Sequence, residues 1–387
     1  MSYAHPSSSY PTPTVAEVNL NHLRHNARVL QTRAGNAPLM GVVKANAYGH
    51  GDIPVARTLL EEGISMLATA RVPEALRLRE AGIDAPILIL GTPFPDYLPT
   101  YVRHNLEVTV PSEAVADAVV ATARQVGPLR VHVKVDTGMS RLGFSPEQAV
   151  AVVRRLDKVP GVTLAGLWTH FATATEYADP FAETQLNRIR PIWESLNDVV
   201  ERVHLAHSGA LFNFPASFQA FDRALVRVGI ALYGLIPPPT DTAPAPLRPA
   251  MRFTSRIVQV KTIPAGTTVS YGRTWRAPSR TRIATVGAGY GDGYARFLSN
   301  RAEVGIHGRR YPVIGTICMD MFMVDLGPPD GHGKPVILGD EVVLFGPGGP
   351  STFEVARWAE TIPYEVCCSL TARVPHLYLD EATSGTE

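Results

Sequence analysis

The chain has 387 residues, of which 45% are hydrophobic and 18% charged, and its formal net charge is +1. This length allows two domains with sizeable cores, and so small a net charge gives no basis for binding nucleic acid or an anionic membrane. Three cysteines (Cys318, Cys367 and Cys368) form no CxxC pair and no disulfide framework, which is typical of a reducing compartment. We therefore expect a cytoplasmic protein that acts on a small molecule.

The first fourteen residues are rich in serine and proline, and they lack both the basic start and the apolar centre of a signal peptide. We expect a flexible tail there. The sequence also has no run of about eighteen apolar residues, the length that a membrane-spanning helix needs.

Strand-like and helix-like segments alternate from Val15 onward. Short apolar runs predict eight strands, at Leu39–Lys44, Ile64–Ala68, Pro86–Leu90, Leu106–Val110, Leu129–Val135, Val162–Thr169, Arg202–Ala206 and Leu225–Tyr233. Helical spacing of apolar residues predicts helices at Pro54–Glu62, Pro73–Ala81, Ser112–Gln125 and Pro146–Leu156. Repeated strand–helix units favour an α/β fold of the TIM-like (β/α)8 barrel type, and an open doubly wound sheet is the alternative.

The composition changes at Ile236–Pro249, where six of fourteen residues are proline. Such a stretch is typical of a stiff connector between domains. Beyond it, short runs between glycine and proline turns predict strands at Met251–Val260, Thr267–Tyr271, Ile283–Val286, Ala302–Ile306, Tyr311–Thr316, Phe322–Leu326 and Glu341–Phe345, and one helix at Phe353–Thr361. We therefore expect a barrel domain at residues 1–240 and a mainly β domain at residues 241–387.

The stretch VVKANAYGHG (residues 42–51) covers the end of the first predicted barrel strand and the loop after it. Lys44 lies at that end, beside small residues that leave room for a ligand. A lysine there is either solvated or held in a pocket, where it can lose its proton and attack a carbonyl group. These ten residues alone leave both interpretations open.

Further polar residues end the predicted barrel strands, where the chemistry of a barrel is gathered. They are Lys134 and Asp136 on the fifth strand, His170 on the sixth, His204 and His207 on the seventh, and Arg227 on the eighth. A single one of them, such as His204, is typical of a paired core residue, because an unpaired buried polar group is costly. The whole set converging on one end of a barrel predicts a site.

The loops after the seventh and eighth strands suggest a phosphate site, which barrels often build there from backbone amides. The candidates are Ser208, Gly209, Gly229 and Ile230. A phosphate beside a lysine that can attack an aldehyde suggests pyridoxal phosphate as a cofactor.

Seven motifs, in order along the chain, resemble those of the alanine racemase family. They are VVKANAYGHG, KVDTGMSRLGF (134–144), LWTHFATA (167–174), VRVGIALYGL (226–235), TVSYGRTW (268–275), GYGDGY (289–294) and GTICMDM (315–321). The resemblance extends from Pro13 to Leu379. It implies a fold-type III pyridoxal-phosphate enzyme that interconverts L- and D-alanine as a homodimer with shared active sites and supplies D-alanine for peptidoglycan.

The resemblance implies two catalytic bases. Lys44 would bind the cofactor covalently and then serve as one acid/base, and Tyr271, in the SYG motif of the β domain, would be the other and reach the site of the partner subunit. Racemisation removes the α-proton from one face of the substrate and returns a proton to the other face, so two different side chains suit it. Nearby cations favour the phenolate, and desolvation favours the neutral amine.

The resemblance also implies binding roles. Arg227 would face the pyridine nitrogen with His204 behind it, and Arg141 would contact the cofactor and the substrate carboxylate. Lys134, which is carbamylated in some members, would hold Arg141. The phosphate would be bound by Tyr48, Ser208, Gly229, Ile230 and Tyr364. His170 would lie close to the cofactor ring, and Tyr290 would lie near the entrance of the site. The partner's Met319 would offer its backbone amide to the substrate carboxylate.

An arginine opposite the pyridine nitrogen keeps its proton, so the nitrogen stays largely unprotonated and withdraws electrons less strongly than it would beside a carboxylate. Decarboxylases of the same fold class resemble the chain less, because they place a carboxylate there.

Three residues depart from the family's pattern. His207 stands in place of an asparagine, Thr175 in place of an acidic residue, and Thr316 in place of a basic one. The motifs leave the roles of these residues open.

Other interpretations remain. The chain could be a broad-specificity amino-acid racemase, or a non-catalytic pyridoxal-phosphate carrier, although such carriers lack a β domain with its SYG tyrosine. His204 and His207 suggest metal ligands, but no cysteine or carboxylate joins them at metal spacing, so we expect no metal. GAGYGDGY (287–294) is no dinucleotide fingerprint because no helix follows it.

Overall fold

In the computed structural model, residues 12–175, 179–235, 246–329 and 334–380 are described. Within these ranges the chain forms two compact units: residues 23–47 and 52–247 make one, and residues 12–22, 48–51 and 248–380 make the other. Most of the predicted N-terminal tail (1–11) and of the proline-rich connector (236–245) lies outside the described residues. The predicted domain boundary between residues 240 and 241 falls there too and stays a prediction.

Eight parallel strands form the sheet of the first unit. They are β2 (Leu39–Val42), β3 (Met66–Thr69), β4 (Ile87–Ile89), β5 (Leu106–Val110), β6 (Leu129–Lys134), β7 (Val162–Trp168), β8 (Val203–His204) and β9 (Val226–Val228). Their order is β8-β7-β6-β5-β4-β3-β2-β9. Hydrogen bonds from Leu225 N to Val203 O (2.9 Å) and from Arg227 N to Ala206 O (3.0 Å) join the last strand to the region of β8. The predicted barrel is therefore confirmed, and the open sheet is wrong, because an open sheet would leave two unpaired edges.

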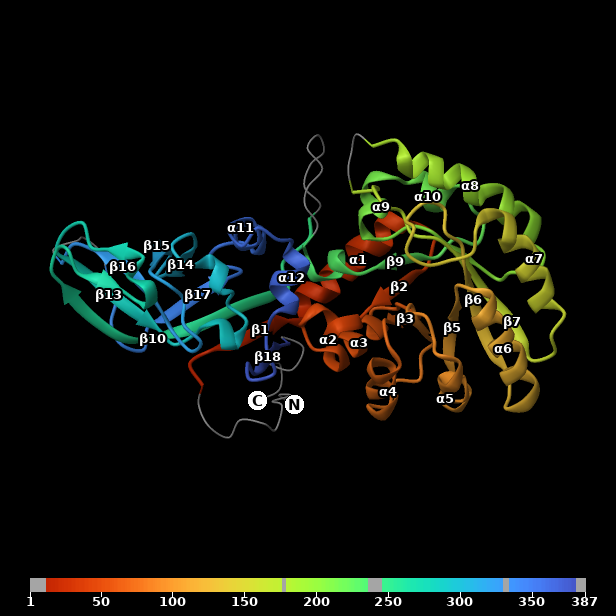
Figure 1. The fold of residues 1–387 in the computed structure, drawn as a ribbon, viewed down its shortest axis with the longest axis horizontal. Coiled ribbons are helices and arrows are strands. Elements are labelled where there is room, and N and C mark those ends of the chain that lie inside the picture. The colour runs from red at the N-terminus through yellow and green to blue at the C-terminus, as the bar shows by residue number, and fades with distance from the viewer. Residues whose placement is uncertain (1–11, 176–178, 236–245, 330–333, 381–387) are drawn as a thin grey trace. The chain divides into compact units, whose positions relative to one another are not determined.

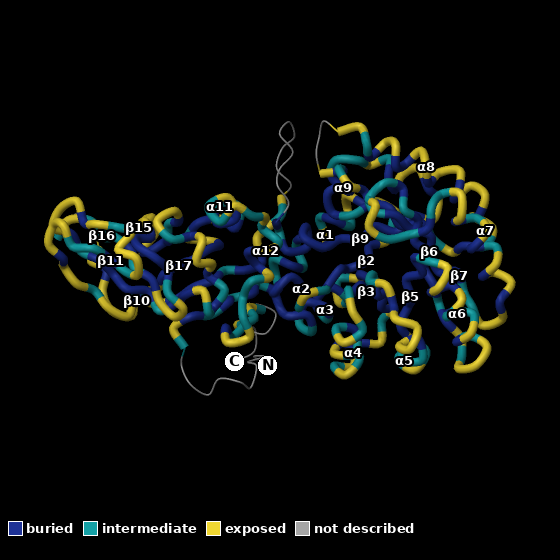
Figure 2. The backbone as a smooth tube through the Cα atoms, in the orientation of Figure 1, coloured by how far each residue is buried: buried dark blue, intermediate teal, exposed yellow. Residues whose placement is uncertain are grey.

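Helices surround these strands, as Figure 1 shows for α4 to α8. The predicted helices occur as α3 (Asp52–Glu61), α4 (Val72–Glu80), α6 (Glu113–Gln125) and α7 (Pro146–Asp157), and the others are α1 (Leu20–Ala34), α5 (Leu98–Arg103), α8 (Phe181–Leu196), α9 (Ser208–Asn213) and α10 (Ala216–Gln219). Helix α7 begins with a capping box at Ser145 and buries Ala149, Val152, Val153 and Leu156, the spacing of one helical face. Figure 2 shows the strands as the buried part of this unit and the outer sides of the helices as exposed.

The turn after β2 is left-handed. In α2 (Lys44–Tyr48), the φ angles of Ala45, Asn46, Ala47 and Tyr48 are 52°, 54°, 53° and 54°. This conformation costs about 1–2 kcal/mol per non-glycine residue. Hydrogen bonds compensate for it: Ala45 N donates to Glu74 Oε1 (2.7 Å), and Asp52 N donates to Asn46 Oδ1 (3.1 Å).

The second unit is built on a second sheet of eight strands. These are β1 (Val15–Asn19), β10 (Met251–Ile263), β13 (Thr281–Val286), β14 (Glu303–Ile306), β15 (Arg309–Ile314), β16 (Phe322–Gly327), β17 (Glu341–Phe345) and β18 (His376–Leu379). The long strand β10 pairs with β1 and β17 through its first half and with β13 through its second half. A two-stranded hairpin, β11 (Thr268–Val269) and β12 (Trp275–Arg276), packs its Val269 into an apolar cluster with Ile263, Ile283 and Ile314.

Some predictions for this unit were wrong. The helix predicted at Phe353–Thr361 is α11 (Thr352–Trp358), but α12 (Pro363–Cys368) and the neighbouring strands β1 and β18 were not predicted. Thr14 was assigned to a flexible tail, yet it is buried and its Oγ1 donates to Gly287 O at 2.7 Å.

The strand predicted at Leu225–Tyr233 is also shorter than expected. Only Val226–Val228 is a strand (β9), and Ile230–Tyr233 forms a 3₁₀ helix, η2. An apolar run of this length does not distinguish a strand from a buried helical turn.

No helix among the described residues is long and apolar enough to cross a bilayer.

We predict that Glu74→Ala destabilises the first unit, because Glu74 accepts backbone hydrogen bonds from Ala45, Ala70 and Arg71. The expected loss in the free energy of unfolding is on the order of 3 kcal/mol, measured by urea denaturation. The control is Glu80→Ala, at the exposed end of the same helix, which should change little. Equal stabilities of the two variants would contradict this role of Glu74.

Candidate active site

The carboxyl ends of the barrel strands bring together the predicted residues of the first unit. Lys134 is the last residue of β6, His204 is the last of β8, and Arg227 lies at the centre of β9. The strand register pairs Lys134 with Trp168, and Trp168 with His204. Lys44 follows β2, which lies next to β9 in the sheet. Side chains far apart in the sequence therefore share one end of the barrel.

A hydrogen-bonded chain of four buried side chains runs between β5 and β9. Glu107 Oε2 lies 2.5 Å from His132 Nε2, His132 Nδ1 lies 2.8 Å from His204 Nε2, and His204 Nδ1 lies 2.9 Å from Arg227 Nη1. Each of these four side chains is buried. At the Glu107 end of this chain, a further residue, Arg130, donates from its Nε to Glu107 Oε1 at 2.9 Å. We call Glu107, His132, His204 and Arg227 the barrel relay.

The end groups determine where each proton lies in the barrel relay. The Arg227 guanidinium can only donate, so His204 accepts at Nδ1 and carries its proton on Nε2. His204 then donates to His132 Nδ1, and His132 donates from Nε2 to Glu107. Both imidazoles are therefore neutral, and all the hydrogen bonds run in one direction, from guanidinium to carboxylate.

The charges of the barrel relay lie at its two ends. Burial lowers the pKa of Arg227 to about 9, and the nearby Arg141 adds to this effect, so the guanidinium is still protonated at neutral pH. Burial by itself would raise the pKa of Glu107, but the hydrogen bonds from His132 and Arg130 outweigh it and lower that pKa below its ordinary value. Burial and the Arg227 charge lower the pKa of His204 well below its ordinary value.

Gly166, on β7, makes room for the contact between the two histidines. A Cβ at this position would lie 2.2 Å from His132 Nδ1 and 3.0 Å from His204 Nε2. A side chain there would separate the imidazoles. The barrel relay therefore requires glycine at this position for space.

These contacts also bear on the metal interpretation. Both ring nitrogens of His204 are engaged in hydrogen bonds, so neither is available to a metal ion. In the part of the chain that the structure describes, no group of three or more His, Cys, Asp and Glu side chains is placed to hold a metal.

Lys134 is buried beside an aromatic ring. Its Nζ lies 4.0 Å from the centre of the Trp168 ring, which stacks on His204. Burial, and then the charges of Arg227 and Arg141, lower the pKa of Lys134 well below its ordinary value. Among the described residues this Nζ has no hydrogen-bond partner. A buried amine without a hydrogen-bond partner is costly. A chemical group attached to this nitrogen could supply the missing hydrogen bonds.

Ser208 and the start of η2 are joined by hydrogen bonds. Ser208 Oγ accepts from Gly229 N (2.9 Å) and from Ala231 N (3.4 Å), which leaves its hydroxyl hydrogen able to donate. Ile230 lies between these two amides in the sequence. A hydroxyl beside backbone amides is the kind of group that binds a phosphate, although here the Gly229 and Ala231 amides donate to Ser208 itself.

His207 caps helix α9, which begins at Ser208. Its Nδ1 accepts from Gly209 N at 3.0 Å, and its ring donates to the Phe171 carbonyl. Burial, and then the charge of Arg227, lower the pKa of His207 to about 4, so the ring is neutral. A neutral imidazole thus supplies one acceptor and one donor, as an asparagine amide would.

Gln185, on α8, holds the loops that follow β6 and β7. Its Nε2 donates to Thr137 Oγ1 and to His170 O, both at 3.0 Å, and its Oε1 accepts from Ala172 N at 2.8 Å. The backbone of His170 is therefore fixed. Burial, followed by the effects of His207 and Arg227, lowers the pKa of His170 well below its ordinary value.

Arg141 lies on the exposed surface of the loop after β6. It is close enough to lower the pKa values of Lys134 and Arg227. Lys44 is only partly buried. The first unit therefore combines an accessible lysine and an accessible arginine with a buried relay.

The second unit carries Tyr271, Tyr290 and Met319 on neighbouring loops. Tyr271 lies in η3 (Tyr271–Arg273), at the tip of the β11–β12 hairpin, and is 73% exposed. Thr316 Oγ1 donates to the Tyr271 carbonyl (2.8 Å), and Tyr290 N donates to the Cys318 carbonyl (3.1 Å). The threonine that departs from the family's pattern therefore supports the backbone of the predicted second base.

Two other predicted residues meet in the second unit. The ring centroids of Tyr48 and Tyr364 are 6.0 Å apart, and burial raises the pKa of both phenols.

Glu107, His132 and Gln185 were not predicted from the sequence. A signal existed for the first two, because each is a polar residue inside an apolar strand, in LEVTV and LRVHVK. His132 also precedes Lys134 by two residues, which places both side chains on the same face of β6. Gln185, on an amphipathic helix, gave no such signal.

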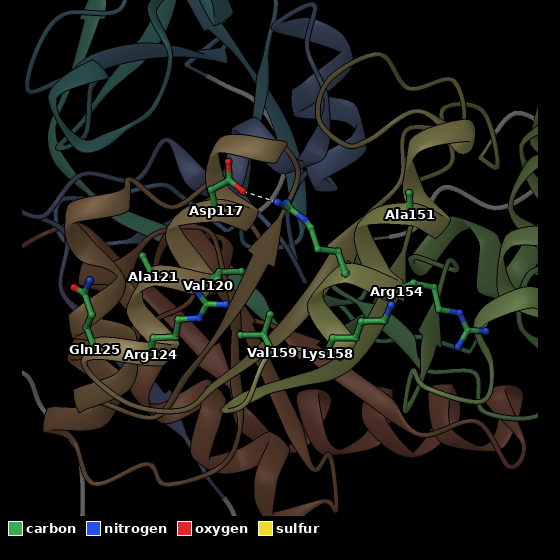
Figure 3. A pocket seen from close by; sticks show the side chains of 10 residues that line it. Asp117, Val120, Ala121, Arg124, Gln125, Ala151, Arg154, Lys158 and Val159 are labelled. Carbon is green, nitrogen blue, oxygen red and sulfur yellow. Dashed lines mark hydrogen bonds and ion pairs between the residues drawn. The ribbon is translucent and has the colours of Figure 1, made fainter.

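A surface hollow between α6 and α7, with a volume of about 810 Å³, is separate from these groups (Figure 3). Two of the four cationic residues that line it are paired: Arg155 with Asp117 and Glu113, and Arg154 with Asp198. Exposed pairs of this kind are typical of a solvated helix surface.

Comparisons with known proteins agree with this geometry. A family model described as "Alanine racemase, N-terminal domain" matches residues 18–237, and one described as "Alanine racemase, C-terminal domain" matches residues 250–378.

Whole proteins match as well. An alanine racemase of Desulforamulus reducens is 41% identical over 374 residues, which cover 95% of this chain and 99% of that protein. An alanine racemase of Chlorobaculum tepidum is 41% identical over 389 residues, covering 97% and 99%. The structure of an alanine racemase of Clostridium difficile 630 matches with a TM-score of 0.87 and 35% identity, covering 96% and 97%. The chain therefore belongs to the alanine racemase family.

Proposed function

We propose that this enzyme interconverts L- and D-alanine with pyridoxal phosphate, that Lys44 and Tyr271 are its two bases, and that it supplies D-alanine for peptidoglycan, as the family does. The observation that carries the proposal is the meeting, at one end of the barrel, of a partly buried lysine, a buried arginine and a serine whose hydroxyl hydrogen can donate. The enzyme acts as a homodimer with shared active sites in the cytoplasm. A small amino acid is its substrate.

The residues present fit the cofactor. Ser208, Gly229 and Ile230 would bind its phosphate, with the Ser208 hydroxyl as one donor, and the family resemblance assigns the phenols of Tyr48 and Tyr364 to the same phosphate. Of the N–H groups of Arg227, those on Nη1 and Nη2 donate to His204, Thr169 and Leu205. Its Nε–H is the remaining donor, and it would face the pyridine nitrogen. His170 lies beside Arg227 and would flank the ring.

When bound, pyridoxal phosphate supplies an aldehyde for Lys44 and withdraws electrons from the substrate Cα. Lys44 and Tyr271 then hold or move the α-proton at opposite faces of that carbon. Arg141 and the partner's Met319 amide hold the substrate carboxylate, which keeps the α-proton in line with the bases, and Tyr290 lies near the entrance.

The exposed second unit supports a shared site. Tyr271 and Met319 are 73% and 52% exposed, although their backbones are fixed by hydrogen bonds of neighbouring loops. Large exposed side chains on fixed loops are typical of a binding surface. We infer that this surface completes the site of a second copy of the chain, whose own surface completes this one.

We predict that borohydride, added to the enzyme loaded with pyridoxal phosphate, fixes the cofactor on Lys44 alone among the chain's five lysines. Peptide mapping by mass spectrometry identifies the labelled lysine. Lys44→Ala should abolish the label, whereas Lys158→Ala, on the surface of the α7 end, should keep it. A label on another lysine, or a protein that stays colourless with the cofactor, would exclude Lys44 as the attachment site.

We predict that Tyr271→Phe keeps the cofactor but slows racemisation by about 10²–10⁴-fold, because one face of the substrate Cα then lacks its acid/base. The measurements are cofactor absorbance and the loss of optical rotation of L-alanine in deuterated solvent. Tyr97→Phe, another exposed tyrosine, is the control and should racemise normally. Wild-type rates in Tyr271→Phe would disprove the assignment of the two bases.

The same assay with serine, lysine and arginine separates a dedicated alanine racemase from a broad-specificity enzyme. Release of carbon dioxide instead of deuterium uptake at Cα would identify a decarboxylase.

We predict that Lys134 forms a carbamate. Its neutral, unpartnered Nζ can attack carbon dioxide, with loss of one proton, and the product carries a negative charge beside Arg141. NMR of enzyme equilibrated with ¹³C-bicarbonate should show one carbamate carbon, which Lys134→Met removes and Lys158→Met retains. Absence of the signal from the wild-type enzyme would show that Lys134 stays an amine.

A further inference from the structure

Arg227 poses a problem of charge. It is 3% exposed, and its Nη groups donate to the Nδ1 atoms of His204 and His170 and to the carbonyls of His204, Thr169 and Leu205. None of these acceptors is an anion. A buried guanidinium without a negative partner is costly. The hydrogen bonds of Arg227 lead through two imidazoles, His204 and then His132, to the carboxylate of Glu107.

We propose that Glu107 is a positioning residue for Arg227: its carboxylate sets the direction of the hydrogen bonds in the barrel relay and so fixes the donors that Arg227 presents to the site. The catalytic consequence rests on the function proposed above. The structural part of the proposal concerns the protein alone.

The reversed chain shows why a direction has to be set. If His132 carried its proton on Nδ1, it would donate to His204 Nε2, and His204 would then carry its own proton on Nδ1. That proton would face the Nη1–H of Arg227 across 2.9 Å, donor against donor. Arg227 would have to turn away from His204. An acceptor that keeps the proton of His132 on Nε2 prevents this, and Glu107 is that acceptor.

The carboxylate is needed because two donors meet at residue 107. His132 Nε2 and Arg130 Nε approach different oxygens, at 2.5 Å and 2.9 Å. A carboxylate accepts both, but a glutamine amide has one oxygen and one donating NH₂ group. If the amide oxygen faces the permanently charged Arg130, the NH₂ group faces His132 and forces the reversed tautomer.

This reasoning predicts how three variants behave. Glu107→Gln should disturb the relay. The double variant Glu107→Gln/Arg130→Met removes the competing donor, so the amide oxygen can face His132 and restore the original tautomers. Glu201→Gln is the control, because Glu201 pairs with Arg130 at the surface and does not contact His132.

The first measurement uses the cofactor-free protein with ¹⁵N-labelled histidine. In the wild type and in Glu201→Gln, NMR should show His132 and His204 protonated on Nε2 only. Glu107→Gln should show His132 protonated on Nδ1 or exchanging between both forms, and the double variant should return to the wild-type pattern. A merely structural role of Glu107 would leave the tautomers unchanged.

The second measurement uses the loaded enzyme. In Glu107→Gln, kcat should fall about tenfold while KM for alanine changes by less than about twofold, since the substrate contacts remain. The double variant should recover most of this loss.

Different failures are distinguishable. If the wild type does not racemise alanine, the proposed function fails, but the NMR experiment still tests the relay. An Nδ1 proton on either histidine of the wild type overturns the proposal. Wild-type tautomers in Glu107→Gln also overturn it, as does a double variant whose tautomers return without recovery of kcat.

Discussion

A guanidinium in the interior of a barrel is the constraint on which the rest of this site depends. Arg227 donates hydrogen bonds to three backbone carbonyls and two imidazoles, and its counter-charge stands on the far side of two histidines. Barrel interiors are normally filled by branched apolar side chains. Here polar side chains replace part of that core, and the four of the barrel relay are tolerated because each is hydrogen-bonded to the next.

This arrangement separates two tasks that polar groups in an active site usually share. The barrel relay holds Arg227 with neutral imidazoles, so no full charge stands next to it except that of Arg141, which is near enough to lower its pKa. The groups that would meet substrate or cofactor, Lys44 and Arg141, lie at the accessible side. The charged groups, Glu107 and Arg227, therefore lie at the two ends of the barrel relay. The two neutral histidines between them fix the direction of the hydrogen bonds.

The sequence predicted the barrel because eight strand–helix units repeat, and it predicted the site residues that sit at strand ends or in family motifs. It could not predict the relay, since Glu107 and His132 are nearly a full strand–helix unit apart and meet only through the lateral register of neighbouring strands. The need for glycine at position 166 could not be predicted either, because it arises from the close approach of two other residues, His132 and His204. Likewise, β1 joins a sheet whose other strands begin more than 200 residues later, a pairing for which local patterns hold no information.

The left-handed turn after β2 has a mechanical consequence. Four consecutive residues adopt a conformation unfavourable for L-amino acids, and hydrogen bonds to the side chains of Glu74 and Asn46 hold this turn directly after Lys44. The Lys44 amine is therefore carried by a hydrogen-bonded stretch of main chain, and rotation of its own side-chain bonds is its main way to move. Its excursions are limited to the arc that four methylenes can sweep.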